Sequence, residues 1–197
     1  MNVSPFHSIL SGSVRHLLRA ETATEHAEVD ACFSPLIGAG DSGYRQFLLL
    51  SATALCPLED GLTRAGVESL LPDWRERSRV SALLADLSEL GVPRPSFDRL
   101  LTLRGEAHIF GVIYVLEGSR LGAEVLARRI SMGARRMTPL PLRYLRHGEG
   151  RPFWRTFIER LEVSDAVKRC PADAVAGARV AFNSFVSAYR ATVPCPS

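Results

Sequence analysis

The sequence has 197 residues, of which 46% are hydrophobic and 23% are charged, and its net charge is +3. This is the composition of a globular domain with an ordinary apolar core, which excludes a disordered chain and a disulfide-stapled miniprotein. No apolar run approaches the roughly 20 residues that span a bilayer. Basic residues are not interleaved with aromatic ones as they are in nucleic-acid binders. We therefore expect no membrane span and no nucleic-acid partner.

The chain is expected to form one domain over residues 1–197, with residues 1–12 as a flexible N-terminal segment. That segment lacks the charged start of a signal sequence. Cysteines lie far apart, so neither a zinc cluster nor a redox dithiol is indicated. Reduced thiols favour the cytoplasm, and a monomer is the default expectation for this architecture. The cysteines are Cys32, Cys56, Cys170 and Cys195.

Apolar residues recur at steps of three and four along six segments, which predicts helices and leaves no convincing strand. Asp73 followed by Glu76 is a capping-box pattern for the third helix, and Pro152 suits the first turn of the fifth. The expected fold class is therefore an all-α, single-domain helical bundle. The expected helices span residues 13–32, 41–65, 73–90, 97–130, 152–161 and 172–191.

Three glycines lie almost on one line along the fourth helix. Gly111, Gly118 and Gly122 are separated by seven and then four residues, and this spacing repeats one helix face. Each interior glycine costs about 1 kcal/mol of helix stability relative to alanine, so a close neighbour must compensate. Either an adjacent helix or a planar ligand would do so, and the helix is expected to bend near Gly118 and Gly122.

His26 stands in register with Val14, Leu18 and Phe33 on the first predicted helix, on the face expected to be buried. A lone histidine in such a place is either a core residue or a ligand. Arg19 precedes it by seven residues, hence two turns and about 10 Å along the helix axis. An arginine fork suits a carboxylate, so the pair would fit one ligand, although a surface role for Arg19 stays open.

Two segments resemble the haem oxygenase family. The run LRAETATEH at residues 18–26 resembles the proximal helix, and YVLEGSRLG at residues 114–122 is similar to the distal-helix motif of bacterial, biliverdin-producing members. The resemblance covers essentially the whole chain. It implies a haem oxygenase-like bundle with haem between the first helix and a glycine-containing distal helix.

The resemblance also implies roles for individual residues. His26 would be the axial iron ligand, Gly118 and Gly122 the catalytic distal backbone contacts, and Arg19 and Arg155 partners of the haem propionates. Ser119 occupies the catalytic position where mammalian relatives have an aspartate that orders water beside bound oxygen. The residue that orders distal water in this chain is therefore not readable from the sequence.

The implied reaction opens haem at a meso carbon, with haem as both substrate and cofactor. O2 and external electrons would yield biliverdin, carbon monoxide and ferrous iron. A ferredoxin or a flavin reductase is the implied electron donor, and a bacteriophytochrome is a candidate recipient of biliverdin. The alternative is a non-catalytic haem-binding or signalling protein on the same fold. Glu117 and Arg120 form either a local helical pair or part of a distal network.

Overall fold

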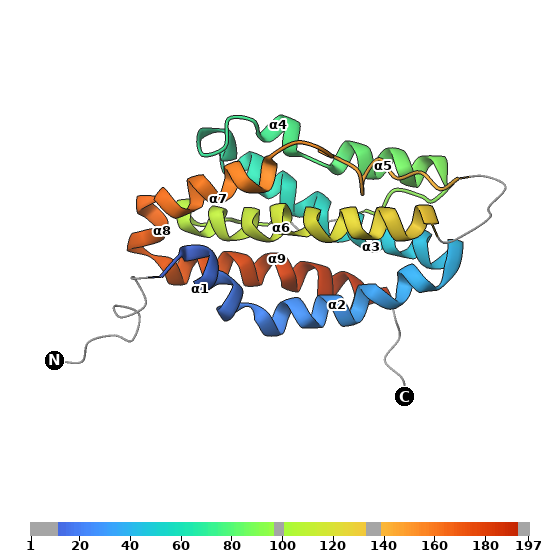
Figure 1. The fold of residues 1–197 in the computed structure, drawn as a ribbon, viewed down its shortest axis with the longest axis horizontal. Coiled ribbons are helices and arrows are strands. Elements are labelled where there is room, and N and C mark those ends of the chain that lie inside the picture. Colours follow the sequence, from blue (N-terminus) through green and yellow to red (C-terminus); the bar gives the residue numbers. More distant parts are fainter. Residues whose placement is uncertain (1–11, 97–100, 133–138, 193–197) are drawn as a thin grey trace.

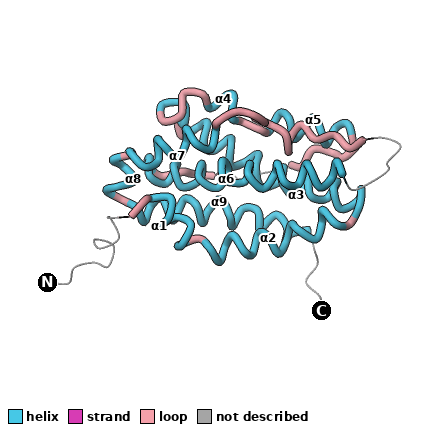
Figure 2. Tube along the Cα trace, in the orientation of Figure 1, coloured by secondary structure: helices cyan, strands magenta, loops and turns pink. Residues whose placement is uncertain are grey.

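The computed structural model describes residues 12–96, 101–132 and 139–192. This part of the chain contains helices and no strand (Figure 2), which confirms the all-helical prediction. The predicted flexible segment falls outside it except for Gly12. The helices are α1 (Val14–Glu21), α2 (Ala23–Gly38), α3 (Gly40–Arg64), the short 3-10 turn η2 (Val67–Ser69), α4 (Trp74–Arg77), α5 (Val80–Glu89), α6 (Gly105–Met132), α7 (Phe153–Val163), α8 (Asp165–Arg169) and α9 (Pro171–Thr192).

The first predicted helix is in fact two helices that meet at Thr22. The hydroxyl of this buried residue donates to the Leu18 carbonyl at 2.7 Å. Such a local bond competes with regular helix geometry and often bends a helix. The chain then continues as α2 as far as Gly38, with Pro35 inside it.

The third predicted helix is also two elements, α4 and α5, and the predicted capping box is wrong. Asp73 makes no capping hydrogen bond and instead pairs with Arg77 at 2.8 Å. The first N–H groups of α5, which have no partner within the helix, are bound by Glu59 of α3, which accepts from the Arg79 N–H at 2.9 Å. A carboxylate from another helix thus replaces the expected local cap.

Helix α9 is the centre of the arrangement, since it packs against α6, α3 and α2. Figure 1 shows it between α6 and the α1–α2 pair. As predicted, Tyr44, Phe47, Leu48 and Leu55 of α3 point into the buried core. None of the described helices is both long and apolar enough to cross a membrane.

Helices α6 and α9 approach one another most closely at two glycines. A Cβ atom at Gly111 would lie 1.9 Å from the carbonyl oxygen of Ala174, and one at Gly177 would lie 2.0 Å from that of His108. Each glycine therefore makes room for the backbone of the other helix. The sequence left open whether an adjacent helix or a planar ligand compensates for these glycines. For Gly111 it is the adjacent helix α9.

Gly111→Ala should lower the free energy of unfolding by about 1–3 kcal/mol, because backbone must move to admit the methyl group. Urea denaturation followed by circular dichroism measures this change. Gly122→Ala is the matched control, since no atom lies within 4 Å of its added Cβ. That control should be stabilised by up to about 1 kcal/mol through helix propensity. Equal stability of the two variants would contradict the close-contact argument.

Candidate functional site

The His26 side chain lies on the surface of α2 and is 63% exposed. The prediction that it belongs to a buried face is therefore wrong. The other members of that predicted face, Val14, Leu18 and Phe33, are buried, and within α2 the buried residues are Phe33 and Leu36. The His26 ring nevertheless contacts the protein on one side. It meets the ring of Phe182 in α9 edge-on, with 5.7 Å between the ring centroids.

The His26 ring lies beside Asp30, one turn further along α2. The distance from Nδ1 to the Asp30 carboxylate is 3.1 Å. When the ring proton is on Nδ1, beside this carboxylate, the lone pair of Nε2 is available to bind a metal ion. A second-shell carboxylate of this kind commonly sets the tautomer and direction of a ligating histidine.

One face of α6 is unusually open. Helix periodicity places Gly118, Leu121, Gly122 and Val125 within one stripe. Leu121 is 49% and Val125 is 56% exposed, and a Cβ atom at Gly122 would meet nothing within 4 Å. Single exposed apolar residues need no explanation, but here two of them flank a bare helix backbone. This stripe can receive a flat apolar group.

The two distal glycines differ in their surroundings. A Cβ at Gly118 would lie 3.5 Å from Cζ3 of the Trp154 indole, in ordinary van der Waals contact. Trp154 comes from α7 and also contacts Tyr114, with 5.8 Å between ring centroids. Gly118 is therefore covered by an aromatic side chain, whereas Gly122 is open.

Positive charge gathers near Trp154. The Arg15 guanidinium lies over the indole at 5.6 Å from its centroid. Burial raises the pKa of the Tyr114 hydroxyl, while Arg15 and Arg19 act against that rise, so both cations lie within electrostatic reach of Tyr114. Sequence reasoning selected Arg19 but missed Arg15, although one helical turn separates them. Arg155 is exposed and its guanidinium lies 3.9 Å from Glu159.

A buried ionic cluster holds α6 from the side away from the stripe. Glu117 is 1% exposed and pairs with Arg77 at 3.0 Å and with Arg120 at 3.1 Å. Arg77 is equally buried and also donates to the Phe153 carbonyl at 2.9 Å. The Glu117–Arg120 helical pair therefore exists, and it belongs to a larger network. Removal of one partner would leave a buried charge uncompensated.

Ser119 is held by a second buried arginine. Arg79 donates to the Ser119 hydroxyl at 2.9 Å and to the Leu116 carbonyl at 3.0 Å. The Ser119 hydroxyl in turn donates to the Leu116 carbonyl at 2.8 Å. These bonds give Ser119 a place in fixing the distal helix.

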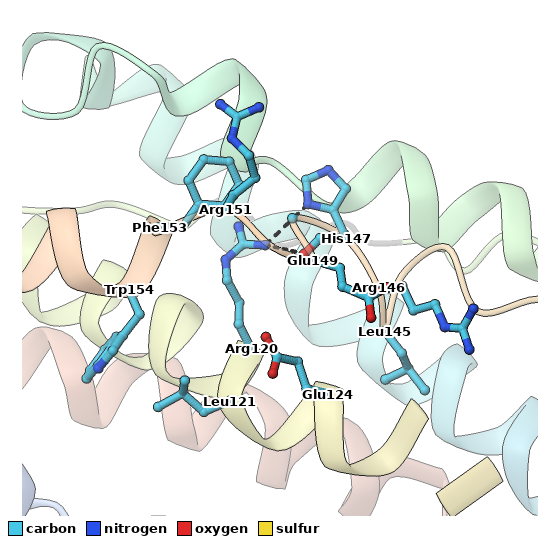
Figure 3. Close-up of a pocket in the computed structure, with 11 residues that line it drawn as sticks. Arg120, Leu121, Glu124, Leu145, Arg146, His147, Glu149, Arg151, Phe153 and Trp154 are labelled. Carbon is cyan, nitrogen blue, oxygen red and sulfur yellow. Dashed lines mark hydrogen bonds between the residues drawn. The ribbon is translucent and has the colours of Figure 1, made fainter. Parts of the chain in front are cut away.

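A small cavity of about 60 Å³ lies beside Arg120, His147 and Phe153 (Figure 3). Ligand pockets for drug-sized molecules are several-fold larger, so this one suits a few water molecules. Nδ1 of His147 lies 3.2 Å from Arg120. Burial, with the nearby Arg120 and Arg79, lowers the pKa of His147 to about 4, so the imidazole is neutral near pH 7.

No protein-family model matches this chain. A heme oxygenase of Xanthomonas campestris pv. campestris is 34% identical over an alignment of 151 positions, which covers 72% of this chain and 86% of that protein. The chain belongs to the haem oxygenase family. A crystal structure of NO- and CO-bound heme oxygenase from Neisseria meningitidis has a TM-score of 0.67 and 26% identity, and the match covers 91% of this chain and 92% of that one.

Family membership and the helical architecture confirm the resemblance to bacterial haem oxygenases. The expectation of a haem-degrading enzyme is confirmed at the level of the family. The structure places His26 and Gly122 on exposed surface and Arg19 near Tyr114.

In this haem oxygenase, α1 carries Arg15 and Arg19 and is fixed at its N-terminus by Glu162 of α7. The Glu162 carboxylate accepts from the backbone N–H groups of Val14 at 2.9 Å and Arg15 at 3.0 Å, and from the Ser13 hydroxyl. Burial raises the pKa of Glu162, but these hydrogen bonds outweigh burial and lower it below its ordinary value.

Glu162→Gln should lower the free energy of unfolding by about 1 kcal/mol near neutral pH, the usual value of a helix cap. A lowered pKa stabilises the fold above the ordinary value of 4.5 and loses this effect as pH falls through the folded pKa. The difference between wild type and variant should therefore shrink in acid. Urea denaturation across pH measures it. Glu159→Gln, on the exposed side of α7, should change stability by less than about 0.5 kcal/mol at any pH. A Glu162 effect that does not depend on pH would contradict the role of its charge.

Proposed function

We propose that this chain opens haem at a meso carbon, using O2 and electrons from a separate donor, and releases biliverdin, carbon monoxide and ferrous iron. The observation that carries the proposal is the exposed, Asp30-oriented imidazole of His26, next to Phe182. Helix α9, which bears Phe182, also packs along α6. One flat ligand lying over α9 could thus meet His26 and the open stripe of α6.

His26 would hold the haem iron through Nε2. The Asp30 carboxylate, 3.1 Å from Nδ1, keeps the ring turned and makes the imidazole a stronger donor to iron. A neutral imidazole is a suitable axial ligand for oxygen binding, whereas a thiolate would favour cleavage of the O–O bond.

The open stripe of α6 would cover the distal face of the ring. Leu121 and Val125 supply apolar surface whose burial against a porphyrin is favourable by about 25 cal/mol per Å². At Gly122 the backbone itself can approach the ligand, because no side chain intervenes. This wall would exclude bulk water. Because glycine has no side chain, position 122 would place no acidic group beside the iron.

Arg15, Arg19 and Tyr114 would bind the propionates at one edge of the ring. Arg19 forms no ion pair or hydrogen bond with other described residues, and the Arg15 guanidinium stands over Trp154 at 5.6 Å. Charge-assisted bonds from arginine to a carboxylate are among the stronger polar contacts in proteins. Arg155 remains a weaker candidate, since it faces Glu159 on its own helix.

Bound haem supplies the redox chemistry, and the protein supplies orientation and protection. Gly118, Ser119 and Gly122 are proposed as the catalytic part of the distal helix, in which the Gly122 backbone would face the ring directly and Gly118 would lie under the Trp154 indole. Ser119 would act through its bonds to Arg79 and to the Leu116 carbonyl, which set the height of the helix over the ring. Protons would be delivered through water.

The same proposal includes partners and location. Electrons would come from a ferredoxin or a flavin reductase, and a bacteriophytochrome could receive the biliverdin. We place the enzyme in the cytoplasm as a monomer. In the described part of the chain Cys32, Cys56 and Cys170 are free thiols, as is usual in a reducing compartment.

His26→Ala should weaken haem binding and abolish biliverdin formation, because the iron loses its axial ligand. Asp30→Asn should reduce turnover about tenfold, the lower end of the range for second-shell partners of a metal ligand. The measurement is a haemin titration followed by absorption, then addition of a ferredoxin reductase system in air. Loss of the Soret band with growth of a red biliverdin band reports turnover.

His16→Ala is the control for the histidine substitution, because His16 is an exposed residue of neighbouring α1. It should behave like the wild type. A wild-type Soret band that persists under turnover conditions would identify a haem carrier or sensor. Failure of the wild type to bind haem would leave only the fold in common with the family.

Gly122→Leu tests the distal wall without disturbing the protein core. Its Cβ points into open space, and leucine is a better helix former than glycine by up to about 1 kcal/mol. The apoprotein should therefore be at least as stable as the wild type, while haem affinity and turnover fall about tenfold or more through steric conflict. Thermal unfolding without haem and haemin titration measure the two effects.

Gly38→Leu is the matched control for this substitution. Gly38 is also a helical glycine with no atom within 4 Å of its added Cβ, but it lies at the end of α2. It should leave haem binding unchanged. If Gly122→Leu binds haem as tightly as Gly38→Leu, the open stripe is not the distal wall.

A further inference from the structure

Trp154 occupies the space above one of the two distal glycines. Its Cζ3 and Cη2 atoms lie 3.5 and 3.7 Å from the position of a Cβ on Gly118. The indole is held on three sides. Its centroid is 5.8 Å from that of Tyr114 and 6.2 Å from that of Phe157, and the Arg15 guanidinium lies 5.6 Å above it.

This position limits how far a flat ligand can extend along α6. A ring lying on the stripe finds bare backbone at Gly122 but meets the indole at Gly118. Trp154 is half-buried and packed against Phe157 of its own helix and Tyr114 of α6. The indole therefore forms an end wall to the open stripe.

The end wall lies among the cations proposed to bind the propionates. Arg15 stacks on the indole, and Arg19 lies within electrostatic reach of the adjacent Tyr114. Carboxylates drawn to these arginines must settle around the indole. The haem can be seated in several rotations about its iron–histidine bond, and each rotation would bring different ring substituents against the Trp154 indole. The indole therefore favours some rotations over others.

We propose that Trp154 is a specificity-determining residue that fixes the in-plane rotation of haem and thereby selects the meso carbon that is oxidised. The inference rests on the proposed function, since it concerns how the same site seats the same substrate. The contact of an indole edge with the ring periphery acts together with the arginines, which anchor charge but leave the rotation less closely defined. Figure 3 shows the Trp154 side chain pointing away from Arg120.

The test compares Trp154→Phe and Trp154→Ala with the wild type. Biliverdin isomers made in single-turnover reactions are separated by chromatography and quantified. The ratio of minor to major isomers should change two- to tenfold, the range expected when an aromatic contact of ordinary strength is lost. Trp154→Ala should have the larger effect, because phenylalanine keeps part of the flat surface.

Trp74→Phe is the matched control, since Trp74 is the other tryptophan of the chain. Trp74 lies in α4, where its Nε1–H donates to the Thr63 hydroxyl at 3.1 Å. This variant should keep the wild-type isomer ratio even if its stability falls. A general loss of stability would therefore not mimic the predicted change.

A second readout does not require turnover. Proton NMR of the ferric haem complex resolves the haem methyl resonances, whose pattern depends on the rotation of the ring relative to the axial imidazole. The wild type and Trp74→Phe should show one dominant set, and Trp154→Phe should show a shifted or doubled set. This measurement judges Trp154 even if the wild type binds haem without degrading it, an outcome that would overturn only the proposed function.

Unchanged isomer ratios and unchanged methyl patterns in both Trp154 variants would overturn the inference. If Trp154→Ala does not fold, Trp154→Phe decides. If both variants fold by circular dichroism but no longer bind haem, the indole is needed for affinity, and its assignment as a selector of rotation is wrong.

Discussion

The close contact between α6 and α9 determines where the rest of the molecule can lie. At Gly111 and Gly177 the carbonyl group of each helix occupies the place of a side chain on the other. Such a contact fixes the separation of the two axes, because any added methyl group would meet backbone. Further along α6, a Cβ atom at Gly122 would meet no atom within 4 Å, from α9 or from any other element. Helix α9 thus covers the glycine face of α6 at Gly111 and leaves it open at Gly122.

A second constraint acts on the opposite side of α6. Arg77 and Glu117 are each 1% exposed and bind one another at 3.0 Å, while Arg79 binds the Leu116 carbonyl. Buried charges are costly unless they are paired and hydrogen-bonded. This cluster contributes little to stability through the hydrophobic effect, but it defines the rotation of α6 about its axis and its position relative to the neighbouring helices. A face that must receive a ligand in one orientation benefits from such support.

The sequence placed helical segments correctly because apolar periodicity follows directly from burial of one helix face. Their bounds were less accurate: two expected helices are pairs of helices, and the helix expected from residue 97 begins at Gly105. The sequence did not reveal the partners that cap a terminus from elsewhere in the chain. The start of α5 depends on Glu59, 20 residues from Arg79. The start of α1 was predicted correctly at residue 13, but not its partner Glu162, 148 residues from Val14. Local patterns such as Asp73 with Glu76 cannot reveal these partners.

The residues of the site also divide into those that the sequence predicted and those that it missed. The family motifs gave His26, Arg19 and the distal glycines, since those positions are encoded within short segments. They did not reveal the exposure of His26, which lies one turn after the break at Thr22. Nor did they reveal Trp154, whose contact with Gly118 depends on the packing of α7 against α6.

The three interior glycines of α6 show why their helical spacing alone could not separate structure from function. Gly111 admits a neighbouring backbone, Gly118 lies under an indole, and Gly122 meets nothing. Only the first is required by packing within the protein. The other two weaken the helix by about 1 kcal/mol each relative to alanine, without a contact inside the chain that demands a glycine. A destabilising residue without a structural reason indicates a functional one, and at Gly122 the surrounding apolar surface indicates that the reason is a ligand lying against the backbone.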